Sequence, residues 1–161
     1  MTRLIRNRLS AAALVKDDRG ATLVEAAIMT PILLLLTFAI VDFAGLFYVY
    51  LALENGASQA TRYAVTGQVI TGQTREQSIK TAMRQATPTL TIPDEAFAFS
   101  HMKPGTSVWV SGAGGEGDIG RLTITYPWNL MTPVIRPFFT NGQLVIRVES
   151  AMKNERRFSG D

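Results

Sequence analysis

The stretch that decides the fold is AAIMTPILLLLTFAIVDFAGLFYVYLAL, residues 26–53, which has 28 residues and a single charged one, Asp42. As a helix it is about 42 Å long, more than the roughly 30 Å of hydrocarbon in a bilayer. Tyr48 and Tyr50 stand near its end, where membrane helices carry interfacial aromatic residues. We therefore predict a transmembrane helix over residues 21–53. The alternative is a core helix of a soluble protein, which this length without charge disfavours.

The charges on either side of this stretch predict its orientation. Downstream of it the first basic residue is Arg62, whereas five basic residues precede it: Arg3, Arg6, Arg8, Lys16 and Arg19. The positive-inside rule then places residues 1–20 in the cytoplasm as a basic leader, and residues 54–161 on the outer side as an extracytoplasmic domain.

Two targeting signals are alternatives to a retained anchor. A secretory signal peptide has an apolar region of about 7 to 15 residues, and the run here is about twice that. Residues 1–16 are Arg-rich and free of acids, as in an organelle presequence. Neither alternative accounts for the long apolar run that follows, so we favour the anchor.

The segment DDRGATLVEA, residues 17–26, looks like a type IV prepilin processing site. Cleavage after Gly20 makes Ala21 the new N-terminus and Glu25 the fifth residue of the mature chain. Glycine lets an extended backbone enter a protease cleft, and the helix dipole favours an anion in the first turn by about 0.3–1 kcal/mol. In a filament Glu25 could pair with the α-amino group of a neighbouring subunit. The alternative is an interfacial Glu that reaches the lipid headgroups.

A wider segment, about residues 19–67, resembles the TadE-like family of pseudopilins from bacterial tight-adherence (Tad, or Flp) pilus systems. The resembling features are Arg19-Gly20, Glu25, Pro31, the pair Asp42-Phe43, and a tail formed by Ala57, Ala60, Arg62, Tyr63 and Ala64. A weaker resemblance covers residues 120–155. Major pilins of these systems usually carry Tyr after the Glu, and Ala26 stands there, which argues against the major subunit.

The resemblance implies a minor pseudopilin that assembles or primes a Tad-type pilus. Its implied partners are other pilin or pseudopilin subunits, a prepilin peptidase and the inner-membrane assembly platform. The implied location is the bacterial inner membrane, in a single pass with a periplasmic C-terminal domain, or a pilus at the cell surface. The alternative is an uncleaved, signal-anchored envelope protein that acts in the assembly machine or in adhesion.

Two features of the long helix suggest contacts. Asp42 falls within the predicted span, where an ionised carboxylate costs about 2.5–3.5 kcal/mol and normally faces a partner. We expect it to pair with a polar group on another helix of the assembly; a locally satisfied Asp is the alternative. Small residues recur every four positions and form a smooth ridge for close packing, against the protein's own sheet or a partner: Ala52, Gly56, Ala60 and Ala64.

The rest of the chain predicts an α+β, pilin-like fold with an antiparallel sheet of about four strands. Capping-box spacing of Thr74 and Gln77 predicts a short helix that Pro88 ends. Strands are expected at 96–102, 107–111, around 121–128 and around 144–152, from alternating polarity and turn signals. Between the last two strands, we expect a loop or short helix that packs Phe138 and Phe139.

Chemistry is nearly absent from the sequence. The chain has no cysteine and one histidine, His101, with no second ligand at metal spacing. The segment SGAGGEGDIG lacks the Lys-Ser/Thr of a phosphate-binding loop and is expected to be a flexible connection, and Glu116 and Asp118 have no second carboxylate cluster beside them. Basic residues after position 55 are scattered, unlike a nucleic-acid surface. We expect no enzyme, no cofactor and no metal site.

Overall fold

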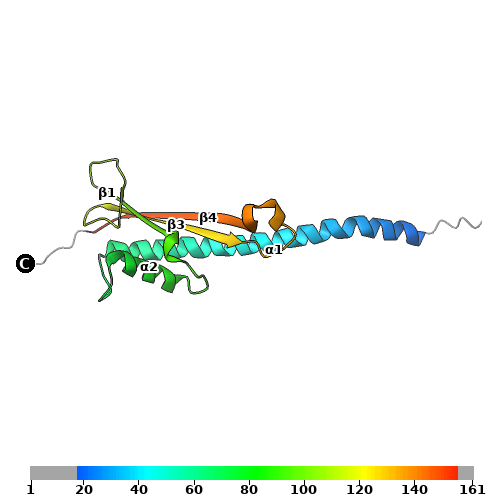
Figure 1. Ribbon diagram of the computed structural model, residues 1–161, viewed down its shortest axis with the longest axis horizontal. Coiled ribbons are helices and arrows are strands. Elements are labelled where there is room, and N and C mark those ends of the chain that lie inside the picture. Colours follow the sequence, from blue (N-terminus) through cyan, green and yellow to red (C-terminus); the bar gives the residue numbers. More distant parts are fainter. Residues whose placement is uncertain (1–17, 156–161) are drawn as a thin grey trace, which may run out of the picture.

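The computed structural model describes residues 18–155, with side-chain burial from Gly20 on. Most of the predicted leader therefore lies outside the described residues. The longest element is α1, Asp18–Val65, a helix of 48 residues that extends far beyond the rest of the domain (Figure 1). Pro31 lies inside α1 without ending it, and the helix stops just before Gly67, whose φ of 64° suits glycine.

Four antiparallel strands form one sheet in the order β2-β1-β3-β4. They are β1 Phe97–Met102, β2 Val110–Ser111, β3 Ile119–Asn129 and β4 Gln143–Lys153. The two long strands pair along their whole length, from Ile119 opposite Lys153 to Asn129 opposite Gln143. They lie along the C-terminal half of α1 (Figure 1). The predicted α+β, pilin-like fold with a four-stranded antiparallel sheet is confirmed.

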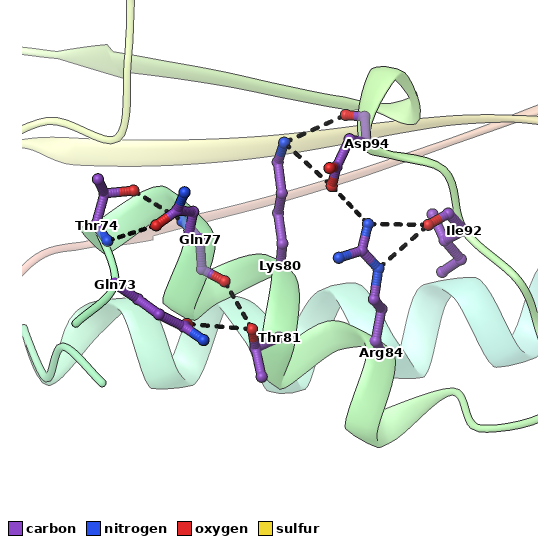
Figure 2. A network of polar contacts seen from close by, with 8 residues as sticks. All are labelled: Gln73, Thr74, Gln77, Lys80, Thr81, Arg84, Ile92 and Asp94. Carbon is purple, nitrogen blue, oxygen red and sulfur yellow. Dashed lines mark hydrogen bonds and ion pairs between the residues drawn. The ribbon is translucent and has the colours of Figure 1, made fainter. Parts of the chain in front are cut away.

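Helix α2, Arg75–Ala86, begins at the predicted capping box. The Thr74 side chain accepts a hydrogen bond from Gln77 N at 3.2 Å, and Thr74 N donates to Gln77 Oε1 at 2.8 Å (Figure 2). These contacts satisfy two amides that the first helical turn leaves without partners. The buried residues of α2 include Ile79 and Met83, as its apolar periodicity predicts.

The hydrophobic core combines the C-terminal half of α1, the apolar face of α2 and one face of the sheet. Its buried members include Leu53, Ala57, Ala60, Ile79, Met83, Leu122, Ile124, Ile146 and Val148. The charged ends of Lys80 and Arg84 lie over the Phe97 ring, which places α2 beside β1, whereas α1 contacts β3 and β4. The fold therefore has two layers, with the helices on one face of the sheet.

The segment between α2 and β1 is fixed by a small polar network (Figure 2). It contains the short 3₁₀ helix η2, Asp94–Ala96. Arg84 Nη2 lies 2.5 Å from Asp94 Oδ1 and also donates to the Ile92 carbonyl, while Lys80 Nζ lies 3.5 Å from the same carboxylate oxygen. The hydrogen bond from Arg84, followed by the charge of Lys80, lowers the pKa of Asp94.

Two local predictions differ from the structure. The strand expected over 107–111 is reduced to Val110–Ser111, because only Ser111 and Val110 find partners, Ser100 and His101, on β1. The prediction that the loop after β3 packs Phe138 and Phe139 is wrong. This loop contains two 3₁₀ helices, η3 Arg136–Phe138 and η4 Thr140–Gly142, which leave Phe138 81% exposed and Phe139 37% exposed.

Candidate functional site

The three residues of the predicted processing site lie at the start of α1. Gly20 is in the first turn and is exposed, and a side chain added to it would meet no atom within 4 Å. Ala21 and Glu25 are also exposed, and their four-residue separation places them on one face of the helix. The structure therefore leaves all three accessible to another molecule, while their roles stay predictions.

The segment from Ala21 to Val41 is almost entirely exposed, and we call it the bare half of α1. Within it only Phe38 and Ala39 are even half-buried, although the segment is rich in Leu and Ile. Its 21 residues make about 32 Å of helix, close to the thickness of a bilayer's hydrocarbon. In a soluble protein such a helix would be mostly buried. Here only 11% of the most apolar 18-residue stretch of the helix is buried. One N-terminal apolar helix of this kind is consistent with a single membrane anchor.

Asp42 ends the bare segment and is buried within its own chain, with 4% of its surface exposed. Its Oδ1 accepts hydrogen bonds from Met131 N at 2.7 Å and from Thr132 N at 3.1 Å. Its Oδ2 accepts a hydrogen bond from the Thr132 hydroxyl. The carboxylate thus fixes the start of the loop that follows β3, 90 positions away in the sequence.

Close packing on α1 accompanies this contact. A Cβ added to Gly45 would lie 3.0 Å from Met131 Sδ and 3.1 Å from Trp128 Cζ2, so glycine leaves room for these two side chains to pack against the helix. Trp128 and Leu130 are buried there. The pairing of Asp42 with another helix stays a prediction. Both of its oxygens, however, already accept hydrogen bonds from its own domain.

The ridge of small residues is also covered by the protein itself. A side chain on Gly56 would come within 2.5 Å of Thr87 Cγ2 and 3.3 Å of Met83 Cε, so this part of the ridge receives the end of α2 rather than the sheet. Ala60 is fully buried, while Ala52 and Ala64 are half-buried. A role of the ridge toward a partner subunit stays a prediction.

The glycine-rich connection before β3 is held by polar contacts. Arg75 donates to the carbonyls of Gly114 and Ala64, at 2.6 and 2.9 Å, and so joins this loop to the last turn of α1. Asp118 and Asn154, both buried, bind the backbone of Gly115 from its two sides. These residues have a structural role that their spacing did not reveal.

Residues 18–155 contain no group of three or more His, Cys, Asp or Glu side chains that could hold a metal ion. His101 Nδ1 lies 3.2 Å from the Gly112 carbonyl, inside the β1–β2 hairpin region.

Sequence reasoning missed the backbone of Met131 and Thr132 as partners of Asp42. No local pattern marks a contact between residues this far apart. One sequence feature does mark the loop that provides these partners. It is the pair Phe138-Phe139, two large apolar residues in a proline-containing connection without periodicity, where no strand or helix buries them.

Comparison with known proteins finds a similarity to one protein family. A family model described as TadE-like protein matches residues 20–62, and neither a curated protein nor a solved structure matches the chain. The matched segment contains Gly20, Glu25, Asp42 and most of α1. TadE-like proteins are structural pilus components and are not known enzymes, and the family implies a pseudopilin-like protein associated with the Tad pilus. Over residues 20–62, therefore, the chain is similar to TadE-like proteins, as its sequence suggests.

Proposed function

We propose that the chain is a minor pseudopilin, a structural subunit that helps to assemble or prime a Tad-type pilus. The observation that carries the proposal is that two segments begin at the same place in the chain. The TadE-like match, residues 20–62, begins where the bare apolar half of α1 begins. A long helix with a bare first half and a covered second half is what a subunit needs to rest in a membrane before assembly.

In this proposal the membrane-spanning segment is residues 21–41, shorter than the 21–53 expected from hydropathy. The physical reason is that Val49 and Leu53 are buried in the domain core and so cannot face lipid. The leader lies in the cytoplasm and the domain from Asp42 onward lies in the periplasm, as the basic residues before the span suggest. Partner subunits, the prepilin peptidase and the inner-membrane assembly platform then meet the chain at α1.

Processing after Gly20 is the step that separates a pilus subunit from a plain signal anchor. The cut creates a free amino group on Ala21 at the start of the helix. Glu25 then lies in the first turn, where the helix dipole favours its charge by about 0.3–1 kcal/mol. Paired with the Ala21 amine of a neighbour, the Glu25 carboxylate would fix how far one subunit is displaced along the next.

The test of processing uses intact mass and N-terminal sequencing of protein extracted from the membrane of cells with an active peptidase. The mature chain should begin at Ala21. Gly20→Val should accumulate a leader-bearing form, and because a Cβ at Gly20 has no neighbour within 4 Å outside its own stretch of helix, a packing clash would not explain it. Ala27→Val, at an exposed position of the same helix, is the matched control and should be processed normally. Wild-type protein that begins at Met1 or Thr2 would favour the uncleaved envelope anchor.

The test of assembly uses Glu25→Ala and a sheared-fibre fraction. Cleavage should proceed as in the wild type, whereas incorporation into fibres should fail because the neighbour's amine loses its partner. Glu54→Ala removes an exposed acid from the covered half of α1 and should leave incorporation unchanged. Equal incorporation of both variants would exclude the proposed role of Glu25.

Topology has its own test, since the chain contains no cysteine. A cysteine at the exposed Ser107 should react with a membrane-impermeant thiol reagent in spheroplasts. Reaction only after lysis of the membrane would place the domain in the cytoplasm.

A further inference from the structure

The loop between β3 and β4 presents an unusual apolar surface. Four of its large hydrophobic side chains are exposed, and Phe138, at 81%, is the most exposed of all those described. The others are Met131, Val134 and Phe139. We call residues 130–139 the aromatic loop. Side chains of this kind cost free energy in water, so a surface that gathers them needs a covering.

The place of the aromatic loop along α1 indicates what covers it. The hydrogen bonds from Met131 and Thr132 to Asp42 fix the loop at the first charged residue after the bare segment. In Figure 1 the loop, drawn in orange, lies at the end of the sheet nearest the N-terminal half of α1. If residues 21–41 span the hydrocarbon, Asp42 and the loop lie where hydrocarbon meets the headgroups.

The aromatic loop is built to hold its side chains outward. Arg136 Nε donates to the Leu130 carbonyl at 2.8 Å and closes the loop across its base. Phe138 N donates to the Ile135 carbonyl at 3.0 Å, which forms the turn of η3. Leu130 is buried while Phe138 is not, so the loop has an inner side that packs and an outer side that does not.

Exposed aromatic residues also lie on α1, just after Asp42 along the helix. Phe43 and Phe47 are exposed there, and their rings stack with centroids 6.2 Å apart. Tyr48 and Tyr50 follow about one helical turn further along α1 and are also exposed. Aromatic residues gather at membrane–water interfaces because their rings suit the headgroup region. The loop thus extends an interfacial belt that the helix begins.

We propose that the aromatic loop is a second membrane contact, which inserts Phe138 and Met131 into the headgroup–acyl boundary of the leaflet that α1 leaves. The ligand is the lipid surface itself. This inference rests on the proposed membrane anchoring of residues 21–41. Before assembly, lipid already surrounds the helix at the level of Asp42, so the loop needs no other partner to be covered. Two contacts instead of one fix the rotation of the domain about the α1 axis.

The experiment measures the depth of nitroxide labels on single cysteines, in full-length protein reconstituted into vesicles of phosphatidylethanolamine and phosphatidylglycerol. The chain has no native cysteine to interfere. Phe138→Cys reports on the aromatic loop. Val108→Cys is the matched control, because Val108 is a similarly exposed apolar residue, at 67%, near the β1–β2 connection far from Asp42. Leu34→Cys reports on the anchor.

The labels at positions 34 and 138 should relax with oxygen and be shielded from a water-soluble nickel chelate, whereas the label at 108 should show the reverse. Relaxation of the 138 label by the chelate, with the 34 label shielded, would overturn the loop contact and leave the anchor standing. Relaxation of both would overturn the anchor and the loop contact together. Shielding at 138 that appears only after other pilus subunits are added would assign the surface to a protein and overturn the lipid contact.

Discussion

The two halves of α1 make the most instructive comparison in the molecule. Residues 21–41 and 42–65 belong to one uninterrupted helix, and both are strongly apolar up to Leu53. Yet the first half is bare, whereas the second half is covered on one side by the sheet and α2. Hydropathy alone does not separate a surface for lipid from a surface for protein.

The halves differ in having, or not having, small residues where another element packs against the helix. The bare half contains an unbroken run of large residues from Ile32 to Leu36. The covered half contains small residues at the places where another element approaches, namely Gly45 under Trp128 and Gly56 under Thr87. Small residues permit close approach of a second backbone, whereas a lipid chain needs no such space.

The test with the largest expected effect compares one substitution in each half of α1. Leu53→Ala removes a fully buried side chain and should lower the free energy of unfolding by about 2–5 kcal/mol, because a cavity remains. Leu34→Ala, at a position 48% exposed, should change it by less than about 0.5 kcal/mol. Chemical denaturation in detergent, followed by the combined fluorescence of Trp109 and Trp128, measures both. Equal losses would mean that the bare half also packs on the domain.

The boundary between the halves is tested by Asp42→Ala. Leaving the amides of Met131 and Thr132 and one hydroxyl without an acceptor should cost about 2–4 kcal/mol in the docking of the aromatic loop. Hydrogen exchange at those two amides should accelerate while exchange in β3 and β4 changes little. Glu54→Ala is the control on the same helix. Unchanged hydrogen exchange at the two amides would favour the hypothesis that Asp42 pairs with another subunit.

A smaller effect is expected from Gly56→Val. The added carbons meet Thr87 and Met83, so overpacking should lower the free energy of unfolding by about 1–3 kcal/mol. Gly20→Val makes the same change in open space and should leave the domain's thermal unfolding midpoint unchanged. A fully tolerated Gly56→Val would show that α2 can move away from α1 without loss.

The smallest effect concerns pH and lies outside α1. Arg84 and then Lys80 hold the pKa of Asp94 below its ordinary value of 3.8 in the folded protein. The stabilisation is therefore present above about pH 4 and is lost as pH falls through the lowered pKa. Unfolding midpoints measured from neutral to acid pH should fall less steeply for Asp94→Asn than for the wild type. Identical slopes would show that this exposed network contributes nothing measurable.

Much of the fold could be predicted because its signals are local. The length and hydropathy of residues 26–53 predict α1, the spacing of Thr74 and Gln77 predicts the start of α2, and alternating polarity predicts β3. Each depends on neighbours within a few positions. The same holds for the TadE-like resemblance, which rests on a short run of residues at the start of the helix.

The rest could not be predicted because it depends on contacts between distant residues. Asp42 within an apolar run suggests a partner, but nothing in the run says that the partner is Thr132 of the same chain. Phe138 and Phe139 were expected inside because apolar residues usually are, and the structure holds them outside through the bond between Arg136 and Leu130. Site residues of this kind require the geometry.

The pairing of β3 with β4 has a mechanical consequence. Eleven residue pairs join the two strands, and the strands lie along α1. Glu155 N donates to the Val65 carbonyl, so the end of β4 is fixed at the tip of the helix opposite Asp42. We expect a pull applied between Asp42 and that tip to be shared by α1 and the hairpin beside it, because the two are joined at both ends. A domain of this design would stretch little before it yields when it is drawn along its own long axis.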